Sequence, residues 1–313
     1  MTDPSPEQQA ALKQEIALLE QKLKHAKAQL NDAVQEEEAV APLLYHTSNE
    51  LPHNTTSTLP THSLHTLLLL SDSALPLGSF AFSSGLESFL AHEKVKVASS
   101  GNTANPSQLS SFHIFLKVSL QSLASAALPY VLAAYREPSR IEEWDNDFDA
   151  SAICTVARRA SVAQGRALLS VWERSFRDHH TLTSSSTSTD AISFLASFST
   201  SLKSSSHNAY PPNAHLAPLW GILTLILSIP LHSSAYLFLF SHARTVISAA
   251  VRASVLGPYQ AQHVLASTEL RDLMKGLVER YWDRRTEDAG QTVPAVDLWV
   301  GRHELLYSRI FNS

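Results

Sequence analysis

Hydrophobic residues recur every three or four positions along much of this chain, which is the spacing of one face of an α-helix. The clearest stretch is residues 8–37, which contain no glycine or proline. Glu20 and Lys24 form a favourable pair one helical turn apart in it. The pattern predicts an amphipathic helix that either pairs as a coiled coil or packs against its own chain. Its apolar heptad positions are Leu12, Ile16, Leu19, Leu23, Ala26 and Leu30.

The polar stretch after this helix divides the chain into parts. Residues 42–63 carry three prolines and many serines, threonines and histidines, which is typical of a linker. We therefore expect an N-terminal heptad segment over residues 1–41, a disordered linker, and a main domain over residues 64–313. Two low-complexity stretches within the main domain, 178–189 and 203–213, predict surface loops.

Helical spacing continues beyond the linker, and no run alternates for long with the period of two that a strand requires. We expect an all-α fold, a single helical-bundle domain of about ten helices beside the N-terminal amphipathic helix. The first two helices should cover Leu64–Leu70 and begin again at Gly85, with a compact connection between them. Further helices are expected from Ser107 with an end or kink at Pro129, from Asp149 or Ser151, over the positions Ile192 to Leu202, and over residues 214–229, 231–256 and 259–282.

Composition limits what the chain can do. Hydrophobic residues make up 44% of 313 residues, enough for a sizeable core, and the formal net charge is −5, so no basic field is available for nucleic acid or anionic lipid. Cys154 is the only cysteine, which excludes a disulfide framework and fits a cytoplasmic protein. The apolar stretch Leu216–Ile229 is shorter than the roughly 20 residues of a membrane-spanning helix, which favours a buried core helix.

Sequence motifs for catalysis are absent. The chain contains no GxxxxGK[ST] phosphate loop, no GxGxxG, no HExxH and no GxSxG elbow, although His303 and Glu304 form the first half of a zinc motif. We therefore predict no catalytic residues, no resident metal and no tightly bound cofactor. The chain should act by binding partners. A stand-alone helical hydrolase with a serine and histidine site is the alternative.

One later helix presents a small, polar stripe on one side. The stripe permits close approach by another helix, and Arg252 could donate to a carboxylate or to helix-end carbonyls. Ser248 and Arg252 are therefore candidate interface residues. The alternative is ordinary packing within the domain, with Arg244 and Arg252 reaching solvent along their stems. The stripe consists of Ser241, Thr245, Ser248, Ala249 and Arg252.

Four blocks of sequence together resemble one family. They are LLLLSDSALPLGSFAFSSGLE (67–87), RRASVAQGRALL (158–169), SHARTVISAAVRASVLGPYQAQHVL (241–265) and RHELLYSRIFNS (302–313). In this order they are similar to the UreF family of urease accessory proteins. The chain resembles eukaryotic, fungal-like members with an N-terminal extension, although the heptad helix over residues 8–37 lies outside the family pattern. The chain departs from the family at Gly78–Ser79, where a pair of glycines is common, and at Phe82, where histidine or tyrosine is frequent.

The resemblance implies a non-enzymatic, all-α and typically dimeric protein. UreF-like proteins join UreD (also called UreH) and the GTPase UreG, and the complex delivers nickel to apo-urease. The family's C-terminal tail docks on UreD. The resemblance therefore implies that the tail residues Tyr307, Ser308, Arg309 and Phe311 contact a partner. Glu87, in the family's Gly-Leu-Glu, is implied as a functional position; the alternative is a first-turn carboxylate that the helix dipole favours.

Overall fold

The computed structural model describes residues 61–100, 108–180, 186–204 and 211–312. The chain divides into two compact units, Met1–Thr58 and Leu59–Ser313, and the described residues all belong to the second. The predicted heptad helix and nearly all of the predicted linker lie outside the described residues.

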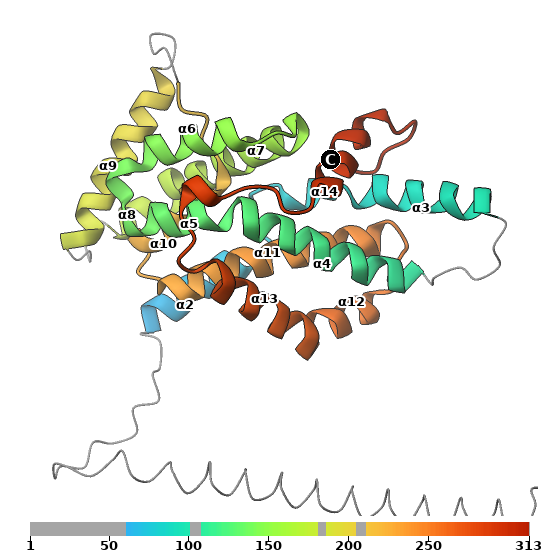
Figure 1. Cartoon of the computed structure of the whole chain (residues 1–313). Coiled ribbons are helices and arrows are strands. Elements are labelled where there is room, and N and C mark those ends of the chain that lie inside the picture. The colour runs from blue at the N-terminus through green and yellow to red at the C-terminus, as the bar shows by residue number, and fades with distance from the viewer. Residues whose placement is uncertain (1–60, 101–107, 181–185, 205–210, 313) are drawn as a thin grey trace, which may run out of the picture. The chain divides into compact units, whose positions relative to one another are not determined.

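The predicted all-α fold is confirmed: within the described ranges every regular element is a helix and none is a strand. Figure 1 shows the helices layered around α10 and α11. The elements are α2 (Thr61–Ser71), η2 (Ser79–Ala81), α3 (Leu86–Ser100), α4 (Gln108–Ala126), α5 (Leu128–Arg136), η3 (Pro138–Arg140), α6 (Ile141–Ser151), α7 (Thr155–Val171), η4 (Trp172–Phe176), α8 (Arg177–His180), α9 (Ser186–Lys203), α10 (Leu216–Ile226), α11 (Leu231–Arg252), α12 (Pro258–Leu265), α13 (Thr268–Tyr281), η6 (Thr286–Asp288), α14 (Pro294–Arg302) and η7 (His303–Leu305).

Helix α10 forms the centre of the core. It is buried along nearly its whole length and packs against α5, α7, α9 and α11 (Figure 1). The contact with α5 is close because Gly221 has no side chain: a Cβ there would lie 2.3 Å from the carbonyl oxygen of Val131. The apolar stretch from Leu216 is therefore a buried core helix, as predicted.

Pro129 separates two helices that would otherwise run on. Helix α4 ends at Ala126, and α5 begins at Leu128 with the proline in its first turn. This position suits proline, because the first N–H groups of a helix have no intrahelical acceptor. Together, Gln108–Arg136 are long and apolar enough to cross a membrane by length and composition, and 67% of their most apolar window is buried inside the domain.

Two helix predictions were wrong in detail. Asp149 and Ser151 lie at the end of α6 rather than at the start of a helix, and α7 begins at Thr155. Helix α6 was missed although Ile141, Trp144 and Phe148 stand at the spacing of one helical face, because acidic and polar residues fill the positions between these three. The helix predicted over residues 259–282 is two helices, since α12 ends at Leu265 and the hydroxyl of Ser267 caps α13.

Two predicted boundaries also differ. The loop predicted over residues 178–189 is helical up to His180 and again from Ser186, because α9 extends further toward its N-terminus than its apolar positions indicate. Helix α2 begins at Thr61, inside the predicted linker. Serine and threonine are poor indicators of these ends because they occur both in helix starts and in loops.

Candidate functional site

The segment between α2 and α3, residues 72–85, is called the signature loop below. Gly78 and Gly85 both adopt positive φ, 70° and 86°, which glycine tolerates best. A Cβ on Gly85 would lie 2.9 Å from the backbone nitrogen of Val300 in α14. Backbone conformation and the close packing of α14 therefore account for these glycines.

Glu87 holds the end of the chain. It lies in the first turn of α3, and its two carboxylate oxygens accept the backbone N–H groups of Ile310 at 2.9 Å and of Phe311 at 3.4 Å. Next to them, the backbone N–H of Asn312 donates to the carbonyl of Ala81 in the signature loop at 2.8 Å. Residues 306–312, called the C-terminal tail below, are thus bound to the signature loop and to α3.

His303 also holds the C-terminal tail, through contacts with Phe311 and Glu87. Its side chain is fully buried, and its Nε2 lies 3.0 Å from the carbonyl oxygen of Phe311 and 3.7 Å from Glu87 Oε2. Because a carbonyl can only accept, Nε2 carries the proton. Burial lowers the pKa of His303, which favours the neutral ring. In the sequence this histidine indicated only half of a zinc motif, so its contact with the tail was missed.

The structure places the predicted tail residues in two different environments. Tyr307, Ser308 and Arg309 are exposed. Phe311 is buried within the chain, with only 4% of its surface exposed. The fold therefore brings Phe311 together with Glu87, while the first three residues face solvent. Their contact with a partner stays a prediction.

Arg252 lies on the other side of Phe311. The centre of its guanidinium is 4.4 Å from the centroid of the Phe311 ring and 5.9 Å from that of Phe80. Ser248, one turn earlier in α11, is exposed. Three segments distant in sequence thus converge: the signature loop, the end of α11 and the C-terminal tail. Phe80 was not among the residues predicted from the sequence.

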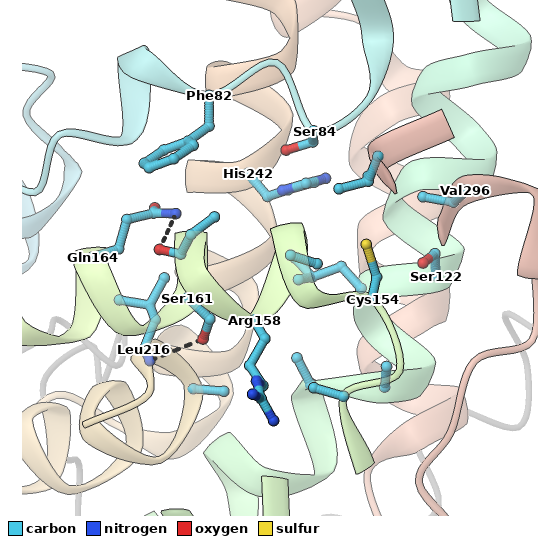
Figure 2. Close-up of a pocket in the computed structure, with 18 of the residues that line it drawn as sticks. Phe82, Ser84, Ser122, Cys154, Arg158, Ser161, Gln164, Leu216, His242 and Val296 are labelled. Atoms are coloured by element: carbon cyan, nitrogen blue, oxygen red, sulfur yellow. Dashed lines mark hydrogen bonds between the residues drawn. The ribbon is translucent and has the colours of Figure 1, made fainter. Parts of the chain in front are cut away.

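A cavity of about 230 Å³ lies beneath the signature loop, between α4, α7, α10, α11 and residues 290–300 (Figure 2). Ser79 of the loop reaches α7, where its hydroxyl donates to Gln164 Oε1 at 2.9 Å. The walls are mainly apolar, with serine hydroxyls along them. In the described part of the chain no three His, Cys, Asp or Glu side chains are grouped so as to hold a metal ion.

His242 is one of the polar groups of this cavity, which Arg158, Gln164 and Asp297 also line. Its Nε2 lies 2.8 Å from Ser119 Oγ, and burial lowers its pKa to about 4. The ring is therefore neutral at physiological pH. The neighbouring Ser241 Oγ is buried and has no hydrogen-bond partner among the described residues. These groups make the cavity weakly polar.

Ser161, His215 and Asp149 form a hydrogen-bonded chain at the edge of the cavity (Figure 2 shows Ser161). His215 Nδ1 is 3.1 Å from Ser161 Oγ, and its Nε2 is 3.0 Å from Asp149 Oδ1. Ser161 Oγ also accepts the backbone N–H of Leu216 at 3.2 Å, and His215 itself precedes the first residue of α10. These hydrogen bonds therefore attach the start of α10 to α6 and α7.

Known proteins resemble this chain over most of its length. The UreF family model matches residues 108–269, which are 162 of 313 positions. A Schizosaccharomyces pombe protein named as an uncharacterised urease accessory protein UreF-like is 36% identical over 249 residues, covering 80% of this chain and 97% of the relative. The rice (Oryza sativa subsp. indica) urease accessory protein F is 31% identical, covering 84% and 89%.

Sequence, helical fold and relatives agree on the class of protein, a urease accessory protein with a role in urease maturation. Bacterial relatives carry the same description; one from Granulibacter bethesdensis is 26% identical over 269 residues, covering 82% of this chain and 97% of the relative. The chain belongs to the UreF family, and the resemblance drawn from its four sequence blocks is confirmed.

Proposed function

We propose that this protein is a non-catalytic scaffold that links the GTPase UreG to UreD and apo-urease during nickel insertion. The observation that supports it most is the C-terminal tail, which is fixed at one end and exposed along the rest. Glu87 holds the tail at Ile310 and Phe311, and Tyr307 and Arg309 project from it. A fixed backbone with exposed aromatic and arginine side chains is a favourable composition for a protein interface.

Because the tail is already ordered, less conformational entropy is lost when a partner binds it. Four hydrogen bonds order the tail. Two come from Glu87 and one from Ala81, more than 200 positions earlier in the chain, and the fourth comes from His303, shortly before the tail. UreD is the partner we assign to this surface. UreG, apo-urease and a second copy of the chain complete the proposed assembly, which we place in the cytoplasm.

Nickel is the cargo of the proposed complex. We do not assign it a resident site in this chain, and we expect any contact with the ion to be brief and made by sparse oxygen or nitrogen ligands. Such ligands exchange readily, as transfer between proteins requires.

Co-expression tests the proposal. The full chain should form a complex with UreD and UreG that survives affinity purification, and deletion of residues 304–313 should remove UreD from it. The matched control is Tyr259→Ala, which removes an exposed aromatic side chain from α12. Retention of UreD by the truncated chain with unchanged affinity would show that the tail is not the docking element.

The hydrolase alternative has one observation in its favour, the chain Ser161–His215–Asp149. A serine and histidine within hydrogen-bond reach, oriented by a carboxylate, can produce an activated nucleophile. Here, however, the imidazole of His215 is fully buried. Its hydrogen bonds to Ser161 and Asp149 hold the start of α10 in place. We expect a fluorophosphonate probe to leave Ser161 unlabelled. A covalent adduct at Ser161 that is lost in His215→Gln would favour the hydrolase.

A further inference from the structure

The guanidinium of Arg252 is positioned but not paired. Its Nε donates to the carbonyl of Ser248 at 3.4 Å, a long hydrogen bond. Arginine carries five N–H donors, so four remain at its outer edge. Among the described residues these four have no acceptor, and no carboxylate lies within ion-pair distance of Arg252. The nearby carboxylate of Glu87 is already used by the tail N–H groups.

Two aromatic rings lie against this guanidinium group. Phe311 comes from the C-terminal tail and Phe80 from the signature loop, with ring centroids at 4.4 Å and 5.9 Å from the guanidinium carbon. A stacked arginine is pre-organised for planar, two-point recognition, and this is a property that lysine lacks. The position of the cation therefore depends on the tail being bound.

The surroundings of Arg252 are exposed and apolar. Phe80 is 66% exposed and Ile310 is 62% exposed, one on each of the flanking segments. The hydroxyl side chain of Ser248 adds an exposed polar group one turn away. An arginine with free donors between exposed apolar side chains has the composition of an interface hot spot. What Arg252 lacks is one negatively charged partner.

We propose that Arg252, Phe80 and Phe311 form a receptor for one carboxylate side chain of a protein partner, which we call the carboxylate receptor. An aspartate or glutamate of the partner binds both Nη groups in the two-point geometry that carboxylates prefer. The apolar residues beside it cover Phe80 and Ile310 and exclude water from the pair. The proposal deepens the proposed function and rests on it, because the partner is UreD, to which the proposed function assigns the tail surface.

Two substitutions separate the parts of the carboxylate receptor. Arg252→Lys keeps the charge but loses the planar fork, and Arg252→Met keeps most of the packing but loses the charge. Both should weaken the complex with UreD by about tenfold or more, as removal of one partner of a desolvated charge pair does. The matched control is Arg280→Met, an exposed arginine in α13, which should leave affinity unchanged.

A purely structural role for Arg252 predicts a different result. If Arg252 only holds Phe311, then Arg252→Met should loosen the tail, and hydrogen exchange at the amides of residues 307–312 should accelerate. We expect exchange there to stay within about twofold of the parent protein, because Glu87, His303 and Ala81 hold the tail independently. Accelerated exchange that accounts for the whole loss of affinity would overturn the proposal.

A charge exchange identifies the occupant. Exposed aspartates and glutamates of the weakened partner are changed singly to lysine and tested against Arg252→Glu in the full complex. One substitution should restore binding to within about tenfold of the parent pair. If none does, the occupant is not a carboxylate. If Arg252→Met binds normally while deletion of residues 304–313 abolishes binding, the carboxylate receptor is wrong and the proposed function stands. If no complex forms with any parent protein, the proposed function itself fails.

Discussion

Glu87 is the single side chain on which the position of the tail most directly depends, because its carboxylate accepts two backbone N–H groups. Hydrogen bonds to a charged acceptor contribute about 1.5–3 kcal/mol each. The substitution Glu87→Gln keeps the shape of the side chain but removes its charge. It also replaces one accepting oxygen with an NH2 donor, which then faces a backbone N–H of the tail. We expect hydrogen exchange at Ile310 and Phe311 to rise by about tenfold or more.

The matched control is Glu304→Gln. Glu304 forms an ion pair with Arg159 in which both side chains are well exposed, and exposed pairs contribute little to stability. Exchange in the tail should therefore be unaffected. Equal exchange in Glu87→Gln and the parent protein would mean that Asn312 and His303 suffice to hold the tail.

His242 should make stability depend on pH. Burial lowers its pKa from an ordinary value near 6.5 to about 4. Below pH 6.5 the unfolded chain then binds this proton more readily than the folded chain, so the free energy of unfolding falls as the pH falls toward 4. We expect His242 to account for a loss of about 1–3 kcal/mol over this range.

Denaturant unfolding at a series of pH values measures this loss. In His242→Gln the slope between pH 6.5 and 4 should be smaller, while exposed His263→Gln should keep the parent slope. His303 contributes a slope of the same sign, since burial lowers its pKa too, so part of the dependence will remain. An unchanged slope in His242→Gln would show that His242 is not buried in its neutral form.

At the scale of elements, the contact between α10 and α5 requires glycine at position 221. Alanine there would bring its Cβ to 2.3 Å from the carbonyl oxygen of Val131, which is backbone and cannot move aside cheaply. We expect Gly221→Ala to destabilise the protein by about 2 kcal/mol or more. Thermal and denaturant unfolding measure the effect.

Gly276 in α13 provides the opposite case. A Cβ there meets nothing within 4 Å, and the residue is exposed in a helix. Gly276→Ala should therefore stabilise the protein by about 0.5–1 kcal/mol, because alanine loses less backbone entropy than glycine. Similar effects of both substitutions would contradict the close packing of α10 on α5.

The elements also show how far sequence reasoning reaches. Helix α10 was predicted because it is apolar nearly all round, whereas α6 was overlooked because only three apolar positions, Ile141, Trp144 and Phe148, mark one of its faces. The role of Asp145 in α6 is clear only in three dimensions: its carboxylate accepts the backbone N–H groups of Asn213, Ala214 and His215, which precede α10. No local pattern indicates that a carboxylate will cap a helix from about 70 positions away.

The candidate site follows the same rule. Glu87 and the tail were both singled out through the family resemblance, but their mutual contact joins positions 223 and 224 residues apart. His303 and Phe80 were missed because single histidines and phenylalanines are common in cores and loops. Family blocks thus marked segments of importance, and tertiary structure was needed to show that three of them meet.

At the scale of the whole molecule, the signature loop and the bound C-terminal tail both lie on the helical domain, the unit Leu59–Ser313. The heptad segment, residues 8–37, belongs to the other unit of the chain, and its apolar positions require a counterpart. A seam of about three heptads with alanine at one position is marginal alone. Pairing between two copies would satisfy it and would support the proposed homodimer.

We expect deletion of residues 1–41 to lower the number of chains per particle, taken as the light-scattering mass divided by the mass of one chain, because the paired seam contributes to self-association. A second variant, Leu19→Asp with Leu23→Asp, places charges in the middle of the seam at full chain length and should lower the mass in the same way. The control Glu20→Gln, outside the seam, should not. If the number of chains per particle is unchanged in both disrupted variants, the heptad segment does not pair between copies, and any dimer must form through the helical domain.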